Sequence, residues 1–174
     1  IKDFSTNSSK SRMSDFYTLY TFLVFVCGLA LSVLSVDYYQ NTFIYFSTLI
    51  VTFGASGLLS GLFHIFLFDS SQKGRSVVIG FGYGLIFCFL LLFMNFNFAD
   101  SKTYYEQFPI IEKGTLAPGR HSDCGKPFIV FEREGMTKRI EFSCSEKEII
   151  DDLKMIKLTV KKGFLNFDII VDKK

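Results

Sequence analysis

The stretch FYTLYTFLVFVCGLALSVLSV occupies residues 16–36 and contains no charged side chain. A helix advances about 1.5 Å per residue and the hydrocarbon core of a bilayer is roughly 30 Å thick, so about twenty apolar residues cross it. Residues 43–68 and 76–98 are also long enough and equally apolar, without a charged side chain. A Lys, Arg or Asp at mid-bilayer would cost about 2.5 to 3.5 kcal/mol, and all three segments avoid that cost. The sequence therefore predicts three membrane-spanning helices.

The charged residues divide the chain of 174 residues into two different halves. The average composition, 49% hydrophobic with a net charge of +2, does not show this division. Residues 16–98 hold only four charged side chains, whereas residues 101–174 hold fourteen Lys or Arg and twelve Asp or Glu. Such apolar runs exclude a single soluble domain, and the hydrophobicity excludes a disordered chain. The mixed signs of the second half argue against nucleic-acid binding. We expect a three-helix transmembrane domain over residues 16–98 and a β-rich domain over residues 99–174.

The basic residues near the predicted spans set the expected orientation. Residues 1–15 carry Lys2, Lys10 and Arg12, and the second loop carries Lys73 and Arg75, whereas the first loop, residues 37–42, has no Lys or Arg. Basic loops stay in the cytoplasm, so the N-terminal segment is predicted to be cytoplasmic and the C-terminal domain periplasmic or extracellular.

The first span has an alternative interpretation as a signal peptide, but its 21 apolar residues exceed the usual core of about 7 to 15, which favours a retained anchor. Abundant Phe, Ile and Lys with no Trp is compatible with a bacterial source. The expected location is therefore a bacterial inner membrane.

Small residues recur at four-residue intervals within the spans. In lipid, small residues let helix backbones approach closely, and this is where much of helix association comes from. We expect these positions either to pack the three helices together or to form a face that docks on another membrane subunit. They are Gly28, Ser32, Gly54, Gly57, Gly61, Gly80 and Gly84.

Alternation of apolar and polar residues predicts strands in the second half. An opening strand is expected over residues 104–112, and two further strands should flank a turn at Glu134-Gly135. One face of that hairpin is expected to consist of Phe128, Val130, Ile140 and Phe142.

Two more alternating runs, residues 156–160 and 165–171, flank a predicted turn at Lys162-Gly163. Between the hairpins, Ser145 and Glu148 have the spacing of a capping box and predict a short helix that ends near Leu153. The expected fold class is thus membrane α plus a small antiparallel sheet or partly closed barrel of about five strands with one short helix.

The four cysteines fall into two groups. Cys27 and Cys88 lie in spans, where they behave as small apolar residues. If Arg133 faces Met136 or Thr137 across the hairpin, Cys144 falls opposite Gly125 or Lys126, close enough to bridge to Cys124. Such a disulfide would be retained in an oxidising compartment, which agrees with the predicted orientation. A zinc site that uses His121, Cys124 and Cys144 is the alternative.

Three polar residues stand out as candidate sites. His64 is the only ionisable side chain inside a predicted span, and a structural hydrogen bond is its expected role. Arg120 and His121 lie in a polar loop. A Cys–His pair in this loop could act as nucleophile and base, but a cysteine held in the expected disulfide cannot attack a substrate. Four lysines of the last strands form a candidate binding stripe for anionic headgroups or an acidic partner: Lys154, Lys157, Lys161 and Lys162.

These features predict a non-enzymatic integral membrane protein, an accessory or scaffolding subunit of a larger envelope complex, without a cofactor or bound metal. Its expected partners are the lipid bilayer, other membrane subunits and, in a homo-oligomer, further copies of itself, but not nucleic acid. One alternative is a membrane immunity or inhibitor protein that neutralises a toxin. Another is a homo-oligomeric channel or transport component, lined by the hydroxyl groups of Ser47, Thr48, Ser56 and Ser60.

Overall fold

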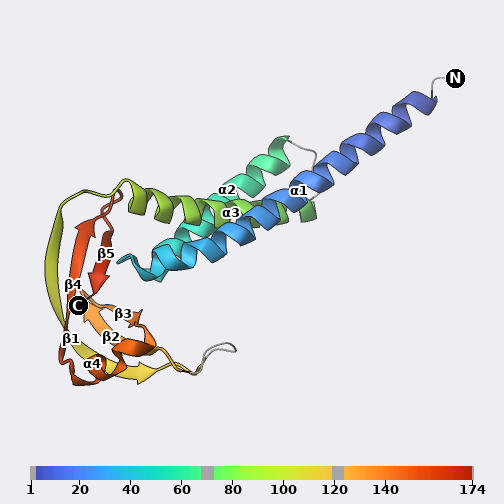
Figure 1. The fold of residues 1–174 in the computed structure, drawn as a ribbon. Helices are drawn as coiled ribbons and strands as arrows, with labels where there is room; N and C mark the ends of the chain where they lie inside the picture. The colour runs from blue at the N-terminus through green and yellow to red at the C-terminus, as the bar shows by residue number, and fades with distance from the viewer. Residues whose placement is uncertain (1–2, 68–72, 119–123, 174) are drawn as a thin grey trace. The chain divides into compact units, whose positions relative to one another are not determined.

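The computed structural model describes residues 3–67, 73–118 and 124–173, with backbone only for residues 3–14 and 73 (Figure 1). The chain forms two compact units. The first is Ile1–Val36 with Phe46–Phe93, and the second is Asp37–Tyr45 with Met94–Lys174. The second unit, called the β-domain below, thus takes in the connection between the first two helices as well as the C-terminal half.

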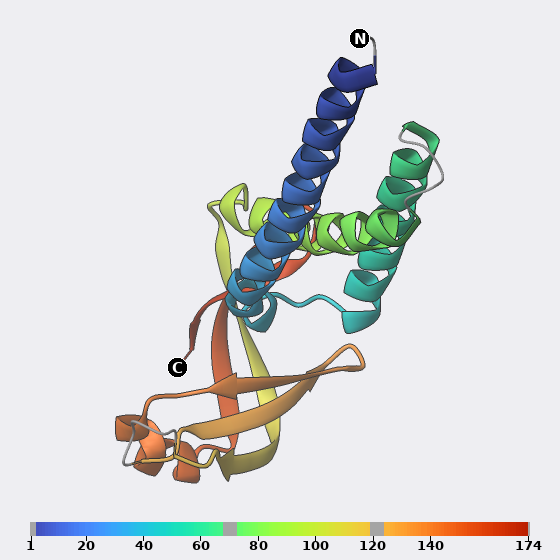
Figure 2. The same ribbon diagram turned by 90° about the vertical axis from the view of Figure 1, so that its right-hand side faces the viewer.

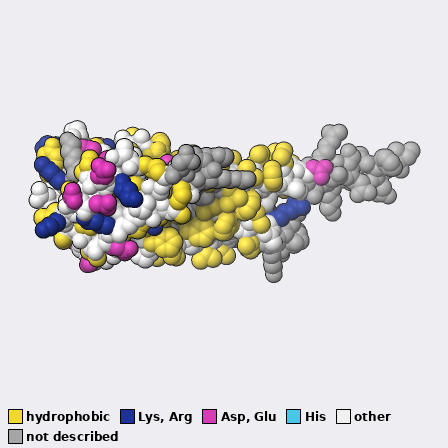
Figure 3. Space-filling view, turned by 60° about the horizontal axis from the view of Figure 1, so that its bottom comes forward, with side chains coloured by type: hydrophobic (Ala, Val, Ile, Leu, Met, Phe, Trp, Pro, Cys, Tyr) yellow, Lys and Arg dark blue, Asp and Glu magenta, His cyan; other side chains and the backbone are white. Residues whose placement is uncertain are grey.

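Three long helices make up most of the first unit: α1 (Asp3–Gln40), α2 (Phe46–Leu67) and α3 (Lys73–Asn97). Each contains an apolar segment long enough to cross a membrane, of 26, 22 and 24 residues. Figure 3 shows hydrophobic side chains gathered over the helices, and charged side chains over the β-domain. The prediction of three apolar helices is confirmed, although α2 begins at Phe46 rather than at Phe43.

Five antiparallel strands form the sheet of the β-domain, in the order β3-β2-β1-β4-β5. Its middle strand, β1, pairs with β4 through residues 103–109 and with β2 through residues 110–115, with a bulge between Ile110 and Glu112. A bulge bends a strand and increases its twist, so the sheet curls into a half-barrel (Figure 2). The expectation of about five antiparallel strands is confirmed, and their bounds are β1 (Thr103–Thr115), β2 (Pro127–Arg133), β3 (Met136–Glu141), β4 (Met155–Lys162) and β5 (Asp168–Lys173).

The β2–β3 hairpin has the predicted two-residue turn. Arg133 pairs with Met136, and both Glu134 (φ 52°) and Gly135 (φ 79°) have positive φ. Positive φ at both central residues matches the right-handed twist of a hairpin, and glycine adopts it without steric cost.

The predicted hairpin face is wrong. Ile129 pairs with Ile140, and these two are buried, whereas Phe128 pairs with Glu141 on the other face. Residues 128–131 are all apolar, so alternation could not assign their faces, and the register of the tight turn decides it.

The short helix is present, but it begins earlier than predicted. The capping box joins Ser143 and Glu146: the serine hydroxyl accepts from a helix amide, and the glutamate accepts from the Ser143 amide, 2.8 Å away. A 3-10 turn (Cys144–Glu146, η2) and the helix α4 (Lys147–Asp152) follow. The predicted box at Ser145 and Glu148 is therefore two residues too late.

The last strand, in contrast, starts later than expected. Lys162 pairs with Asp168, so residues 163–167 form the connection instead of a two-residue turn. Ile169 and Ile170 are both buried, so buried and exposed residues do not alternate strictly along β5. The reason is that the pairing of β4 with β5 shifts register between Thr159 and Val160.

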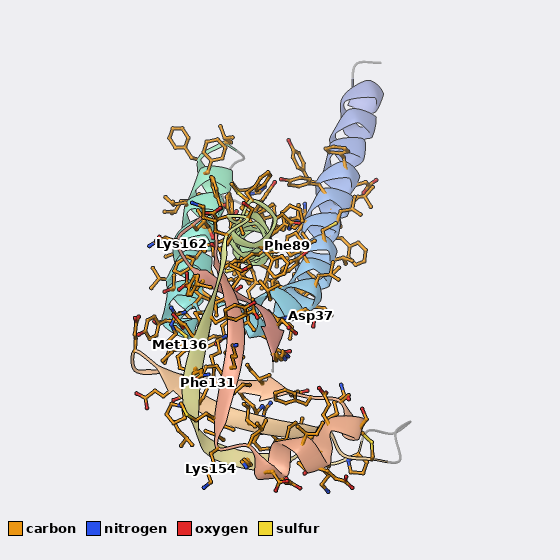
Figure 4. All side chains as sticks on the ribbon, turned by 60° about the vertical axis from the view of Figure 1, so that its left-hand side comes forward. Asp37, Phe89, Phe131, Met136, Lys154 and Lys162 are labelled. Atoms are coloured by element: carbon orange, nitrogen blue, oxygen red, sulfur yellow. A yellow bond between two sulfur atoms is a disulfide. The ribbon has the colours of Figure 1, made fainter. Side chains whose placement is uncertain are left out.

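The core of the β-domain lies inside the curl of the sheet, where Phe131 is fully buried (Figure 4). One member of this core, Phe43, comes from the connection between α1 and α2 rather than from the C-terminal half. The other buried members are Ile129, Phe131, Ile140, Ile150, Ile156, Leu158, Val160 and Ile170.

Candidate functional site

Residues 37–45, called the insert below, add backbone hydrogen bonds to the edge of β5. Thr42 forms an isolated bridge with Ile169. The Phe43 amide donates to the Asp168 carbonyl and the Ile170 amide donates to the Asn41 carbonyl, both at 2.8 Å. An unpaired strand edge attracts other chains, and the insert covers this part of it.

Phe43 anchors the insert in the hydrophobic core. Its side chain is 7% exposed. Its ring centroid lies 6.1 Å from that of Phe131 and 6.3 Å from that of Phe108. The Arg133 guanidinium lies 4.5 Å from the same ring, a cation–π distance.

The insert also contacts the hairpin at the other side of the sheet. Lys138 of β3 is 6% exposed, and its ammonium donates to the Tyr39 carbonyl at 2.7 Å while lying 4.3 Å from the Tyr39 ring centroid. Burial lowers the pKa of Lys138 to about 8. The Tyr45 hydroxyl donates to the Glu134 carbonyl at 2.8 Å. Side chains and backbone of the insert therefore connect β5 with β3 and its turn.

An ion cluster lies beside Phe43. Arg133 donates to Glu106 at 3.0 Å and to Asp168 at 2.7 Å, and all three side chains are mostly buried. Burial is the largest influence on the pKa of Glu106 and raises it, although Arg133 opposes the shift. Burial likewise raises the pKa of Tyr104, next to the cluster. The ion cluster therefore connects β1, β2 and β5 next to the Phe43 ring of the insert.

Asn95, near the end of α3, holds the β4–β5 connection. Its side chain is fully buried. The Asn95 amide group donates to the Phe167 carbonyl and accepts from the Leu165 amide, both at 2.9 Å. The Asn95 carbonyl also accepts from the Phe164 amide at 3.2 Å. A Cβ on Gly163 would collide with this amide group, so the close approach requires glycine there.

Most of the predicted helix-packing glycines lie at close approaches between helix backbones. A Cβ on Gly57 would lie 2.9 Å from the Gly80 carbonyl oxygen, and one on Gly28 would lie 2.7 Å from that of Gly82. Gly82 is the partner that sequence reasoning missed, because its spacing to Gly80 is not four residues. Gly61 approaches the Ser76 carbonyl, and Gly84 approaches Phe53.

Gly54 and Ser32 differ from the other small residues. A Cβ on Gly54 would meet no atom of the described residues within 4 Å, and Gly54 lines an open apolar groove of about 400 Å³ between α2 and α3, beside Leu58 and Val77. The Ser32 hydroxyl donates to the Leu29 carbonyl of its own helix at 2.8 Å.

Of the three candidate polar residues, the structure describes only His64. The ring of His64 hydrogen-bonds through Nδ1 to the Ser76 hydroxyl of α3 at 2.9 Å, a partner that the sequence did not indicate. Arg120 and His121 lie outside the described residues. Cys124 and Cys144 are bonded as a disulfide with Cα atoms 6.3 Å apart, and the Cys144 sulfur lies 3.7 Å from the Gly125 carbonyl oxygen, as the hairpin register predicted.

The four lysines of the predicted stripe lie along β4 and just before it. Lys157 lies 4.5 Å from the Tyr105 ring centroid, and Lys161 lies 5.2 Å from that of Phe96. Lys154 directly precedes β4, and Lys162 is its last residue (Figure 4). The four lysines are thus spread along the length of that strand.

Hydroxyl groups of α2 bond to their own helix. Thr52 donates to the Thr48 carbonyl at 2.8 Å, and Ser56 donates to the Thr52 carbonyl at 2.6 Å. In the described part of the chain, no group of three or more His, Cys, Asp or Glu side chains is placed to hold a metal ion.

Comparisons with protein-family models, curated proteins and solved structures give no match to this chain. Its role is therefore inferred from the contacts described above.

Proposed function

We propose that this protein is a non-enzymatic scaffolding or accessory subunit of a bacterial inner-membrane complex, with its β-domain on the periplasmic side. The observation that carries the proposal is the insert. Because residues 37–45 belong to the β-domain, the chain passes between the two units at three points, after Val36, after Tyr45 and after Phe93. A domain tethered three times loses less freedom on binding a partner than one on a single flexible linker.

The proposed topology is consistent with the insert. Two spans, α2 and α3, separate the insert from the C-terminal half, and two crossings return the chain to the side from which it left. The first loop, which has no basic residues, and the β-domain are therefore expected on the same side of the membrane. This agrees with the charge rule. The disulfide supports an oxidising compartment for that side.

The open groove beside Gly54 is the proposed contact for a partner's transmembrane helix. Small residues permit close helix approach. Unlike Gly57 or Gly80, Gly54 has open space where a side chain would begin, with no atom of the described residues within 4 Å. A side chain placed there would leave the bundle intact but obstruct a partner.

The test is purification of the tagged protein from its native membrane in mild detergent, with partners and their ratio measured by mass spectrometry. We expect one membrane protein at a fixed ratio, recovered again when that protein carries the tag. Gly54→Leu should lose it, whereas Gly74→Leu, an equally open glycine at the start of α3, should retain it.

A homo-oligomer without other subunits would overturn the scaffold role. Flux into liposomes would then favour the channel alternative, and loss of protection against a toxin on deletion would favour the immunity alternative.

A further inference from the structure

The β4–β5 connection presents exposed apolar side chains next to the end of a membrane span. Phe164 is 57% exposed and Leu165 is 36% exposed, and Phe98, just after α3, is 62% exposed. The rings of Phe98 and Phe164 lie 6.0 Å apart, centroid to centroid. These three side chains, called the apolar tip below, form one exposed patch.

Asn95 bonds the apolar tip to the last turn of α3. Its backbone and side chain bond to the backbone of residues 164, 165 and 167. The apolar segment of α3 ends at Asn97, only two residues later, and a helix advances about 1.5 Å per residue. The connection is therefore bonded to the last turn of the span.

Basic groups flank the apolar tip. Lys162 is exposed at the end of β4, its carbonyl accepts from the Asp100 amide at 2.9 Å, and Lys161 lies over the Phe96 ring. Lys102 also follows closely, and its amide donates to the Asp100 carboxylate. Asp168, which pairs with Lys162 in the ladder, is already bonded to Arg133. Apolar side chains flanked by lysines are the pattern of a segment that lies in the membrane interface and attracts anionic headgroups.

We propose that the apolar tip inserts into the interfacial region of the bilayer, on the side where α3 ends, and so attaches the β-domain directly to lipid. Its occupant is the lipid surface itself, because the patch continues directly from the end of an apolar span. The inference goes beyond the scaffold role and holds whether or not a partner subunit exists.

The absence of tryptophan from the sequence makes a direct test possible. Phe164→Trp places one fluorophore in the apolar tip and keeps the backbone bonds to Asn95. Ile149→Trp, on α4 at 65% exposure, is the control for water, and Leu59→Trp, on α2 at 69% exposure and outside the groove beside Gly54, is the control for lipid. Each purified variant is reconstituted into vesicles of phosphatidylcholine with phosphatidylglycerol, and quenching by brominated lipid and by iodide is measured.

We expect brominated lipid to quench the fluorophore of Phe164→Trp almost as strongly as that of Leu59→Trp, and iodide to quench it far less than that of Ile149→Trp. Quenching by iodide equal to that of Ile149→Trp would overturn the inference, because the tip would then lie in water. Protection from both quenchers would also overturn it, because protein would cover the tip. Quenching of Leu59→Trp by lipid verifies insertion of the spans separately.

Anionic lipid provides a second measurement. Replacing phosphatidylglycerol by phosphatidylcholine should weaken lipid quenching of Phe164→Trp, and Lys161→Gln with Lys162→Gln should remove that dependence. Quenching that is identical in both lipids with the lysines present would overturn the role given to the basic groups.

Discussion

The ammonium group of Lys138 donates a hydrogen bond to the main-chain carbonyl of Tyr39, across 99 positions of sequence. A lysine buried to 6% exposure has lost most of its hydration, and this is why the pKa of Lys138 falls to about 8. The contact joins the end of α1 to β3, so its protonation state affects the attachment of the insert.

Lys138 should make stability depend on pH in the alkaline range. Its folded-state pKa of about 8 lies below the ordinary 10.5, so between these values the unfolded chain binds more protons and stability rises with pH. The cost of burying the charge is fully present below pH 8 and disappears above about pH 10.5. Thermal unfolding followed by circular dichroism should show this rise, and Lys138→Met should reduce it. Lys157→Met, at an exposed site on β4, should leave the rise unchanged; a rise retained in Lys138→Met would refute the assignment.

Phe43→Ala should destabilise the β-domain although the residue lies just before the long apolar helix α2. Truncating a buried phenylalanine costs about 3 to 5 kcal/mol. The matched control is Phe46→Ala, three residues later and 63% exposed, for which we expect little change. Limited proteolysis of the β-domain is the measurement, and equal protease resistance of the two variants would show that Phe43 is not part of the core.

Asn95→Ala should release the β4–β5 connection. The Leu165 amide and the Phe167 carbonyl would each lose a partner, and a net hydrogen bond is worth about 0.5 to 1.5 kcal/mol. Hydrogen exchange of the Leu165 amide should become faster. Gln107→Ala, at an exposed position of β1, should not alter that amide; unchanged exchange in Asn95→Ala would contradict the proposed clamp.

Gly57→Ala should weaken the helical unit more than Gly54→Ala. The added methyl group would lie 2.9 Å from the Gly80 carbonyl oxygen in the first variant and in open space in the second. Helices α2 and α3 would have to separate in Gly57→Ala, so its apparent melting temperature in detergent should fall. A similar fall for both variants would mean that close packing at Gly57 does not matter.

Removal of the disulfide should lower the stability of the β-domain. The bridge closes a loop with a sequence separation of 20, which corresponds to about 3 kcal/mol in the chain-entropy model. Reducing agent should therefore lower the melting temperature of the original protein. It should have no effect on the double variant Cys124→Ser, Cys144→Ser, and sensitivity of that variant would point to another cause.

The sequence predicts those features that depend on local chemistry. The three spans follow from their length and lack of charge, and the hairpin turn and the disulfide follow from Glu134-Gly135 and from counting outward to Cys144. The faces of β2 could not be assigned, because residues 128–131 are apolar without alternation. Ser143 and Ser145 both precede a glutamate by three residues, so spacing alone could not identify the cap.

No local sequence pattern predicts that the insert belongs to the β-domain. Phe43 and Ile44 look like the first residues of an apolar span, and the bridge between Thr42 and Ile169 connects positions 127 residues apart. Asn95 similarly looks like the polar end of a helix, and its three bonds to residues 164–167 depend on tertiary structure. The contacts on which the proposals rest are therefore the ones that a single sequence does not reveal.

The insert also determines when the β-domain can be completed during synthesis. Phe43 leaves the ribosome long before β1, so the first part of this core must wait while α2 and α3 are made. A fragment that begins after α3 would lack Phe43 and the backbone bonds to β5, and would expose a hydrophobic gap. Adding a peptide of residues 37–45 to that fragment should restore its fold, in the manner of a split protein reassembled from two pieces.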